Sequence, residues 1–410
     1  MNQSVPFPRT LTGVQMAPNS PADLARKAEL FGLLEKIGEA LDLTDTQYAT
    51  AKTRYETVGD WLAQSDNPML EGVLIYPQGS VALGTANKPI ASDEYDVDLV
   101  AHLSHLLVTS SPAALKAGIG ERLRENGRYA AALEEKQRCW RLTFAGEFHM
   151  DITPSILNPN CSQGGELVPD KKVARWKPTN PPGYKALFEK RAALKPMVRM
   201  AKAMAEDARA DAEIVSFPAQ TSRKGVLRRT VQILKRHRDV HFQDFDSRLA
   251  PLSVIVTTLA AQSYEYCVKT YTFDNAYDLF RATISFMPVF IDVEVKGGER
   301  RWHVWNETTQ GEDFAEKWND EPDRAAAFFQ WHNQALADID RLLVVEGFDE
   351  LKKSLTEAVG SRPVTKAFED MTSAVGQARK AGTLRFAPAA GLTVSAPAGT
   401  SVRANTFFGA

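Results

Sequence analysis

The sequence of 410 residues has few of the features that mark secreted or membrane proteins. It contains three cysteines, Cys139, Cys161 and Cys267, with no C-x-x-C spacing. An odd number without such spacing argues against a disulfide framework. No apolar run approaches the roughly 20 residues of a membrane span, and the first residues, MNQSVPFPRT, lack the charged and apolar regions of a signal peptide. We therefore expect a soluble protein of the reducing cytoplasm, with no membrane partner.

The chain also lacks an excess of charge of either sign. Lysine and arginine number 49, aspartate and glutamate number 51, and the formal net charge is −2. Proteins that bind long nucleic acid without regard to sequence usually present a basic face. The composition therefore argues against long nucleic acid as the main partner, although a local basic patch stays open. At this length we expect two closely packed lobes.

The stretch Val73–Val100, VLIYPQGSVALGTANKPIASDEYDVDLV, carries the strongest chemical pattern. Its first four residues predict a short buried strand. Gly79 and Ser80 then predict the start of a short helix, where free backbone N–H groups and a hydroxyl can hold a phosphate. Sixteen residues past Ser80, Asp96 and Asp98 alternate with apolar residues, so a strand here points both carboxylates to one face. Such a pair either holds a cation or faces open water.

The runs Gln78–Ser80 (QGS) and Asp96–Asp98 (DVD) together resemble the nucleotidyltransferase signature of the polymerase-β-like superfamily. In that superfamily the Gly-Ser helix start holds a triphosphate and the aspartates hold magnesium. The resemblance calls for a third carboxylate from a neighbouring strand. Asp151 meets this requirement as the acidic residue within the otherwise apolar strand pattern FHMDITPSI. Its alternative role is to cap the turn before Pro154.

Segment 225–242, GVLRRTVQILKRHRDVHF, repeats apolar residues at helical spacing. A nucleotide's negative charge requires cations beyond any metal ions. We therefore interpret Lys235 as a phosphate ligand, with a solvated basic face as the alternative for this residue and more so for its neighbours. The cations of the predicted helix are Arg228, Arg229, Lys235, Arg236 and Arg238.

Further motifs resemble the CD-NTases, the bacterial relatives of cyclic GMP-AMP synthase. Lys235 matches the lysine of their L-K-R motif, and segment 304–318, VWNETTQGEDFAEKW, resembles another of their conserved stretches. Ser253, at the start of the predicted helix 251–266, either caps that helix or adds a hydroxyl to the triphosphate. CD-NTases carry a phosphate-binding serine at the corresponding helix start. The likeness covers most of the chain.

The expected fold is α+β, with two lobes and an active-site cleft between them. A polymerase-β-like core of mixed sheet and helices packs against a C-terminal helical lobe. Two N-terminal helices would brace the catalytic sheet, residues 158–184 would form a loop over the rim, and 181–211 would form a long spine helix. The predicted parts are an arm (1–20), the nucleotidyltransferase core (21–210), the helical nucleotide-binding lobe (211–381) and a flexible tail (382–410).

The tail is rich in Ala, Pro, Gly, Thr and Ser and ends in Phe-Phe-Gly-Ala. Too few large apolar groups are present for it to fold alone. Similar tails occur in CD-NTases from operons that encode ubiquitin-ligase-like proteins. By that likeness, an E1/E2-like conjugating partner would join the Ala410 carboxylate to an amine. A disordered tail with exposed aromatics is the alternative.

The resemblance implies a metal-dependent nucleotidyltransferase that joins NTPs, ATP and/or GTP, into a cyclic di- or trinucleotide and releases pyrophosphate. The product would act in anti-phage defence through a downstream effector. Asp96, Asp98 and Asp151 would hold two Mg²⁺ ions, for which Mn²⁺ can substitute. The nucleotide ligands would be Gln78, Gly79, Ser80, Lys235 and Ser253. The alternatives are a template-independent RNA- or tRNA-end nucleotidyltransferase and a non-catalytic sensor or scaffold.

Overall fold

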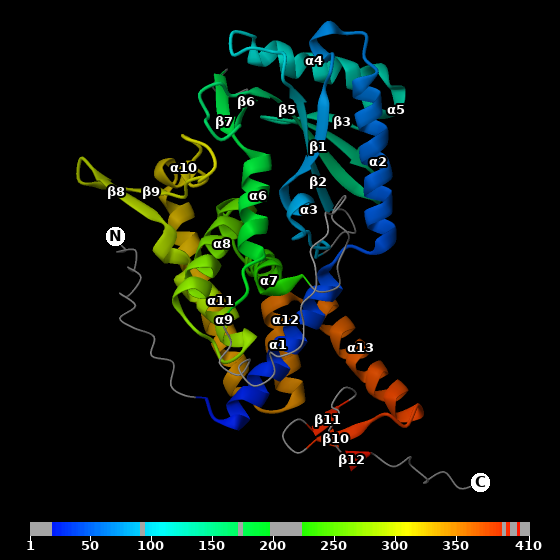
Figure 1. Cartoon of the computed structure of the whole chain (residues 1–410), viewed down its shortest axis with the longest axis vertical. Helices are drawn as coiled ribbons and strands as arrows, with labels where there is room; N and C mark the ends of the chain where they lie inside the picture. Colours follow the sequence, from blue (N-terminus) through cyan, green and yellow to red (C-terminus); the bar gives the residue numbers. More distant parts are fainter. Residues whose placement is uncertain are drawn as a thin grey trace.

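The structure analysed is a computed structural model, which describes residues 19–90, 95–170, 175–196, 224–387, 391–393 and 400–401. Figure 1 shows these residues arranged as two lobes, one built on a mixed β-sheet and the other on packed helices. Sheet and helices therefore occupy separate parts of the molecule, as the predicted α+β class requires.

The first two helices were both predicted, but they serve different lobes. α1 (Pro21–Leu41) and α2 (Asp45–Ala63) each begin with a capping box, in which the side chain of Ser20 or Thr44 accepts from the N–H three residues on. α2 covers the sheet, whereas the apolar stripe of α1, which includes Ile37, packs into the helical lobe. The expectation that both helices brace the catalytic sheet is therefore wrong for α1.

The main sheet has the strand order β1-β2-β5-β4-β3. β2 and β5 are parallel, and the other neighbours are antiparallel. Alternate residues of β2, from Tyr95 to Leu103, are buried against α2 and α4, so the residues between them face away from these helices. The bounds are β1 (Leu74–Gln78), α3 (Gly79–Leu83), β2 (Tyr95–Leu103), α4 (Pro112–Glu125), α5 (Gly127–Ala130), β3 (Leu133–Glu135), β4 (Trp140–Phe144) and β5 (Phe148–Leu157).

The predicted rim loop, residues 158–184, instead contains two strands. β6 (Glu166–Asp170) pairs with the end of β5, and β7 (Arg175–Thr179) pairs with β6. The sequence suggested a loop because prolines occur at 169 and 178. The sheet tolerates them because β7 is an edge strand and β6 pairs with β5 over only two residues.

The predicted spine helix over 181–211 is also shorter in the structure. α6 (Pro181–Ala192) ends four residues before Pro196. A proline disfavours helical conformation for the residue before it, so the helix cannot continue smoothly through this point. The remainder of the predicted helix, from residue 197, lies outside the described residues.

The second lobe is a bundle around one large apolar core that includes Trp331, Phe328 and Tyr277. The helices predicted over 225–242 and 251–266 are present. No helix among the described residues has the length and apolar character needed to cross a membrane. The elements are α7 (Gly225–His241), α8 (Ser253–Thr270), α9 (Ala276–Phe286), β8 (Asp292–Lys296), β9 (Glu299–His303), α10 (Glu316–Asp320), α11 (Pro322–Val344), α12 (Phe348–Val359) and α13 (Ser361–Lys380). Short 3-10 turns cover Pro68–Leu70, Ser247–Leu249 and Met287–Phe290.

The described part of the predicted tail contains regular structure. β10 (Arg385–Ala387), β11 (Gly391–Thr393) and β12 (Thr400–Ser401) pair in the order β11-β10-β12. We expected a flexible tail here because it has few large apolar groups, whereas these residues pair through the backbone. Ala410 and the first 18 residues of the predicted arm lie outside the described residues.

Candidate active site

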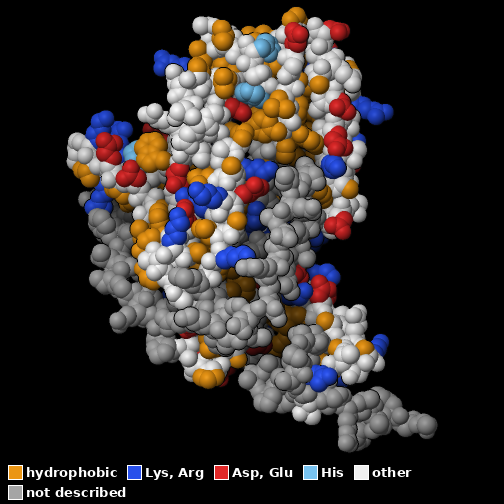
Figure 2. All heavy atoms as spheres, in the orientation of Figure 1, with side chains coloured by type: hydrophobic (Ala, Val, Ile, Leu, Met, Phe, Trp, Pro, Cys, Tyr) orange, Lys and Arg blue, Asp and Glu red, His pale blue; other side chains and the backbone are white. Residues whose placement is uncertain are grey.

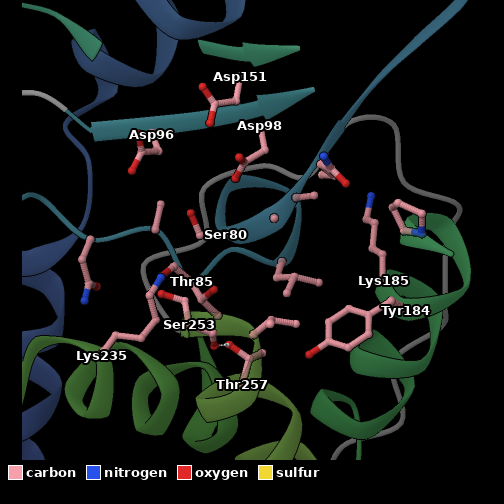
Figure 3. Close-up of a pocket in the computed structure, with 18 of the residues that line it drawn as sticks. Ser80, Thr85, Asp96, Asp98, Asp151, Tyr184, Lys185, Lys235, Ser253 and Thr257 are labelled. Carbon is pink, nitrogen blue, oxygen red and sulfur yellow. Dashed lines mark hydrogen bonds between the residues drawn. The ribbon is translucent and has the colours of Figure 1, made fainter. Parts of the chain in front are cut away.

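The structure brings the three candidate aspartates together on adjacent strands. Asp98 of β2 lies opposite Asp151 of β5 in the parallel register, and Asp96 is two residues before Asp98 on the same side of the strand. Val97, Met150 and their alternating neighbours turn into the core against α2 and α4. The sheet therefore presents all three carboxylates on its other face, above the cavity in Figure 3.

The QGS run lies directly beside this acidic group. Gln78 pairs with Asp98 across β1 and β2, and the chain then enters α3 at Gly79. Gly79 has φ +64°, and a Cβ built on it would lie 2.2 Å from Oδ2 of Asp98. Both the backbone conformation and the contact require glycine here. Figure 3 shows Ser80 between the aspartates and the helices of the second lobe.

Arg141, which the sequence analysis missed, contacts two of the three aspartates. Its Nε and Nη2 donate to the two carboxylate oxygens of Asp151 at 2.7 and 2.8 Å. Nη2 also lies 3.3 Å from Oδ1 of Asp96. Arg141 stands opposite Asp151 in the antiparallel register of β4 and β5. Only the register of β4 against β5 reveals that Arg141 belongs to the site.

The acidic group is electrostatically crowded at Asp98. Burial raises the pKa of the Asp98 carboxyl to about 7, and the nearby carboxylates of Asp151 and Asp96 contribute to the same shift. Lys235 and Arg141 act in the opposite direction. The ionised form of Asp98 is thus costly in this environment and would be stabilised by additional positive charge.

The donor chemistry fits a hard divalent cation. Three carboxylates on two adjacent strands supply the oxygen ligands that Mg²⁺ prefers, and the glycine at 79 leaves open the space beside Asp98 that a Cβ would fill. Within the part of the chain that the structure describes, however, no three acidic, His or Cys side chains converge closely enough to form a finished metal cluster. The guanidinium of Arg141 lies among the carboxylates instead.

Lys235 reaches the same cavity from the second lobe. Its side chain is buried, and Nζ donates to the carbonyl oxygen of Thr85 at 3.0 Å. Burial, with a smaller contribution from Arg238, lowers the pKa of Lys235 to about 8. Lys235 is therefore not part of a solvated basic face, the alternative that the sequence left open. It lines the cavity opposite the aspartates, as Figure 3 shows.

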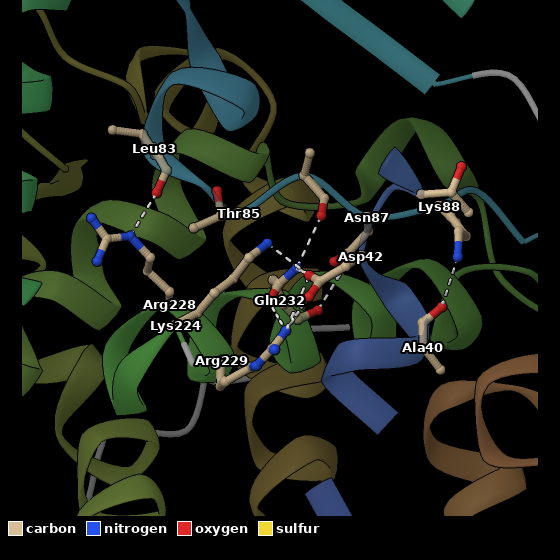
Figure 4. Close-up of polar contacts among 12 residues, drawn as sticks. Ala40, Asp42, Leu83, Thr85, Asn87, Lys88, Lys224, Arg228, Arg229 and Gln232 are labelled. Carbon is tan, nitrogen blue, oxygen red and sulfur yellow. Dashed lines mark hydrogen bonds and ion pairs between the residues drawn. The ribbon is translucent and has the colours of Figure 1, made fainter. Parts of the chain in front are cut away.

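Two neighbouring cations of α7, Arg228 and Arg236, donate to backbone carbonyl groups rather than facing solvent. Four side chains of α7 donate to four carbonyl groups within residues 83–88, the segment that follows α3 and leads toward β2; Figure 4 shows part of this set. The second lobe thereby fixes the path between the QGS run and the aspartates. The pairs are Arg228 with Leu83, Lys235 with Thr85, Gln232 with Ala86, and Arg236 with Lys88.

Ser253 is the first residue of α8, and the N-cap position before it belongs to Leu252, so the Ser253 hydroxyl does not cap the helix. Nη1 of Arg238 donates to its Oγ at 2.9 Å instead. The capping alternative is therefore wrong. The hydroxyl of Ser253 lines the cavity together with Arg238, which leaves it available to a ligand.

These groups line one cavity of about 540 Å³ between the lobes. The side of the cavity away from the aspartates is lined by residues that were not assigned to the site from the sequence. The rings of Tyr184 and Phe314 meet edge to face with centroids 6.0 Å apart, and the Tyr184 hydroxyl lies 2.8 Å from Oγ1 of Thr258. Nothing in the local sequence shows that the ring of Phe314 borders a cavity. Lys185, Asn306 and Glu312 also line this side.

Comparisons with known proteins agree with this arrangement. Residues 33–191 match the Second Messenger Oligonucleotide or Dinucleotide Synthetase domain, SMODS. The CD-NTase CdnG of Bradyrhizobium diazoefficiens, solved in complex with GTP, shares the fold with a TM-score of 0.64 at 22% identity, covering 86% of this chain and 100% of that one. The c-di-GMP synthase of Roseivirga ehrenbergii is 30% identical over 386 residues, which span 93% of this chain and 98% of the relative. The chain belongs to the CD-NTase family.

Two further comparisons extend the likeness. The cyclic dinucleotide synthase CdnG of Bradyrhizobium diazoefficiens is 30% identical over 239 residues, or 54% of this CD-NTase and 56% of the relative. The structure of E. coli MS115-1 CdnC with ATP has a TM-score of 0.55 at 14% identity and covers 84% of this chain and 98% of that one. The predicted polymerase-β-like α+β fold is confirmed, and the relatives identify the chain as a member of a nucleotidyltransferase family.

Proposed function

We propose that this CD-NTase is a metal-dependent cyclic dinucleotide synthase that joins two nucleoside triphosphates, GTP among them, and releases pyrophosphate. One juxtaposition carries the proposal: Asp96, Asp98 and Asp151 share a cavity of about 540 Å³ with Ser80 and Lys235. The c-di-GMP synthase that is similar along 93% of this chain supports a guanine-containing dinucleotide over a trinucleotide.

Asp96, Asp98 and Asp151 would hold the divalent ions, Mg²⁺ or Mn²⁺. Ions bound there supply Lewis-acid activation of the attacking ribose hydroxyl and neutralise charge on the phosphates. The chain's own contribution is to hold the carboxylates in register on β2 and β5. Asp151, half-buried and opposite Asp98 in the strand register, is also the carboxylate suited to take the proton of that hydroxyl.

The triphosphate would lie between Ser80 of the first lobe and Lys235 of the second. A buried ammonium holds a phosphate strongly because little water competes for it. The pKa of Lys235, lowered by burial to about 8, still leaves the side chain charged at neutral pH. The hydroxyl of Ser253 and the guanidinium of Arg238 line the cavity on the same side as Lys235. Together these hydrogen-bond donors would stabilise the departing pyrophosphate.

The direct test is to incubate the protein with the four NTPs and Mg²⁺ or Mn²⁺ and to follow product by mass spectrometry and released pyrophosphate. A cyclic dinucleotide supports the proposal, and Asp98→Asn should reduce its formation at least about 1000-fold. The matched control is Glu147→Gln, which removes a carboxylate in the turn just before β5. This variant should retain activity, because Glu147 pairs with Arg54 and not with a residue of the site. Chelation by EDTA should abolish product, and added Mg²⁺ should restore it.

The same assay with added RNA separates the remaining candidates. A template-independent RNA- or tRNA-end nucleotidyltransferase would extend the RNA instead, and a sensor or scaffold would consume no nucleotide. On the described surface drawn in Figure 2, basic side chains are interspersed with acidic ones. Together with the formal net charge of −2, this supports a small-molecule product over a long RNA substrate.

A cyclic dinucleotide made from abundant NTPs is suited to serve as an alarm signal read by a downstream effector, and we extend the proposal to anti-phage defence. The test is a plaque assay in cells that carry this gene with its neighbours. The Asp98→Asn variant should lose protection if the product is the signal, and protection that survives this variant would contradict this part of the proposal.

A further inference from the structure

The position of Arg141 suggests a role that the proposed reaction does not itself require. Its guanidinium uses two N–H groups on the two oxygens of Asp151, at 2.7 and 2.8 Å, and a third contact reaches Asp96 at 3.3 Å. This bidentate arrangement is the strongest form of arginine–carboxylate pairing. One arginine therefore supplies positive charge to two of the three side chains that would hold the metal ions.

The same contacts place Arg141 in competition with a bound cation. The oxygens of Asp151 that would face a divalent ion already accept hydrogen bonds, and a guanidinium close to such an ion repels it. Yet without a counter-charge the carboxylates would repel one another on adjacent strands, because Asp98 lies directly opposite Asp151. The site therefore requires positive charge both before and after a metal ion arrives.

Arg141 can also leave the carboxylates without disturbing the core. Its side chain is 26% exposed and lines the cavity, whereas the apolar side chains on either side of it, Trp140 and Leu142, are buried. A rotation of the arginine side chain would carry the guanidinium into the cavity, where the phosphates of a nucleotide would receive it. The backbone of β4 need not move for this exchange.

We propose that Arg141 is a built-in counter-cation of the catalytic carboxylates. It pairs with Asp151 and Asp96 and keeps their carboxylates aligned in the metal-free protein, and it gives them up when divalent ions bind. This inference rests on the proposed function, because it assigns the three aspartates to the metal site. By this inference Arg141 is a positioning residue that opposes metal binding. A purely structural ion pair would instead support metal binding.

The test compares the Mn²⁺ affinity of the full-length wild-type protein with that of Arg141→Gln. The affinity is measured by titration calorimetry or by the loss of the electron paramagnetic resonance signal of free Mn²⁺. Removing a positive charge near a divalent ion should tighten binding by at least about tenfold, even at the dielectric constant of water. In EDTA, Arg141→Gln should unfold at a lower temperature than wild type, and Mn²⁺ should restore more of its stability. Unchanged or weaker Mn²⁺ binding in Arg141→Gln would overturn the proposal.

Matched variants make the result specific. Arg54→Gln removes an arginine that makes a similar two-bond pair with Glu147, at 3.2 and 3.1 Å, in the same lobe, and it should leave Mn²⁺ affinity unchanged. Arg141→Lys keeps the charge, so its Mn²⁺ affinity should stay within about threefold of wild type. If Arg141→Gln does not fold, a tenfold gain for Arg141→Lys would overturn the proposal, and affinity near that of wild type would support it.

Asp98→Asn separates failure of this inference from failure of the proposed function. If the aspartates form the metal site, the single variant Asp98→Asn should bind Mn²⁺ more weakly than the wild-type protein. If it does so while Arg141→Gln has no effect, the counter-cation role is wrong and the proposed function stands. If Asp98→Asn leaves Mn²⁺ binding unchanged, the metal site fails, and both proposals fail with it.

Discussion

The carboxylate of Asp42, in the turn between α1 and α2, accepts two hydrogen bonds from Nη1 of the buried Arg229 on α7, each 3.0 Å long. Lys224 and Gln232 donate to the same carboxylate at 2.7 and 2.8 Å, as Figure 4 shows. Gln232 also donates to the carbonyl of Ala86, in the segment next to the cavity. The junction of the two N-terminal helices and the path to the catalytic strand are therefore tied to one helix of the second lobe.

Asp42→Ala should destabilise the protein and loosen the active site together. The change leaves Arg229 and Lys224 without a shared counter-charge in a buried setting, which costs about 3 kcal/mol of unfolding free energy. Urea denaturation measures this loss. Glu39→Ala, three residues earlier, removes a carboxylate from an exposed pair with Lys36 and should cost less than about 0.5 kcal/mol. Equal losses of unfolding free energy for the two variants would show that the buried pairs of Asp42 stabilise the protein no more than the exposed pair of Glu39 does.

Gly79→Ala should reduce activity strongly, while Gly72→Ala should leave most of it. Both glycines have φ +64°, so both variants carry the same backbone strain of about 1 kcal/mol. Only at Gly79 does the new Cβ meet a neighbour, Oδ2 of Asp98 at 2.2 Å, whereas nothing lies within 4 Å at Gly72. Displacing that carboxylate should slow product formation about 100-fold. Similar rates for the two variants would contradict the importance of this contact.

Nucleotide binding should weaken as the pH rises through about 8. Burial lowers the pKa of Lys235 from its ordinary value of 10.5 to about 8, so the free enzyme carries a charged Lys235 below that pH and loses the charge above it. ATP is a suitable probe because its phosphates are already ionised in this range. Its dissociation constant, measured from pH 7 to 9.5, should rise above pH 8 for wild type. Lys235→Arg stays charged throughout and should bind with little pH dependence; a parallel rise in both proteins would assign the effect to another group.

The same shift predicts how Lys235 affects stability. In the folded protein the charged form is disfavoured, so burying it costs stability at pH values below about 8, and this cost disappears as the pH approaches 10.5. Lys235→Met should therefore lose nucleotide affinity yet unfold at a higher temperature at pH 7. The gain in melting temperature should shrink between pH 8 and 10.5. A variant that is less stable at pH 7 would show that the hydrogen bond to Thr85 outweighs the burial cost.

Ser253→Ala should act mainly on substrate binding. The hydroxyl accepts from Arg238 and lines the cavity, and one hydrogen bond contributes about 1 kcal/mol. We expect KM to rise about fivefold with kcat within twofold of wild type. Steady-state kinetics of pyrophosphate release provide the measurement. A fall in kcat of a hundredfold or more would instead give Ser253 a part in the chemical step.

Local patterns predicted much of the fold. The starts of α1 and α2 follow from Ser20 and Thr44, whose capping boxes need only residues three apart. The alternation in YDVDLVAHL predicted the face on which Asp96 and Asp98 lie. The strands over 166–179 were missed because their prolines are unfavourable in most strands, and an edge position is a property of the whole sheet. The sequence also did not show to which lobe α1 belongs, because an apolar stripe on a helix does not indicate which surface it packs against.

The sequence by itself determined the chemical groups of the site: local pattern pointed to Gln78–Ser80 and the alternating aspartates, and the family resemblance added Asp151 and Lys235. Only the tertiary structure decided how these groups meet. It set Arg141 against Asp151 through strand register, and it turned Arg228, Lys235 and Arg236 toward the backbone of residues 83–88. The physical reason is that alternation and helical period are properties of neighbouring residues, whereas register, lobe packing and the partner of a buried charge depend on residues far apart in the chain.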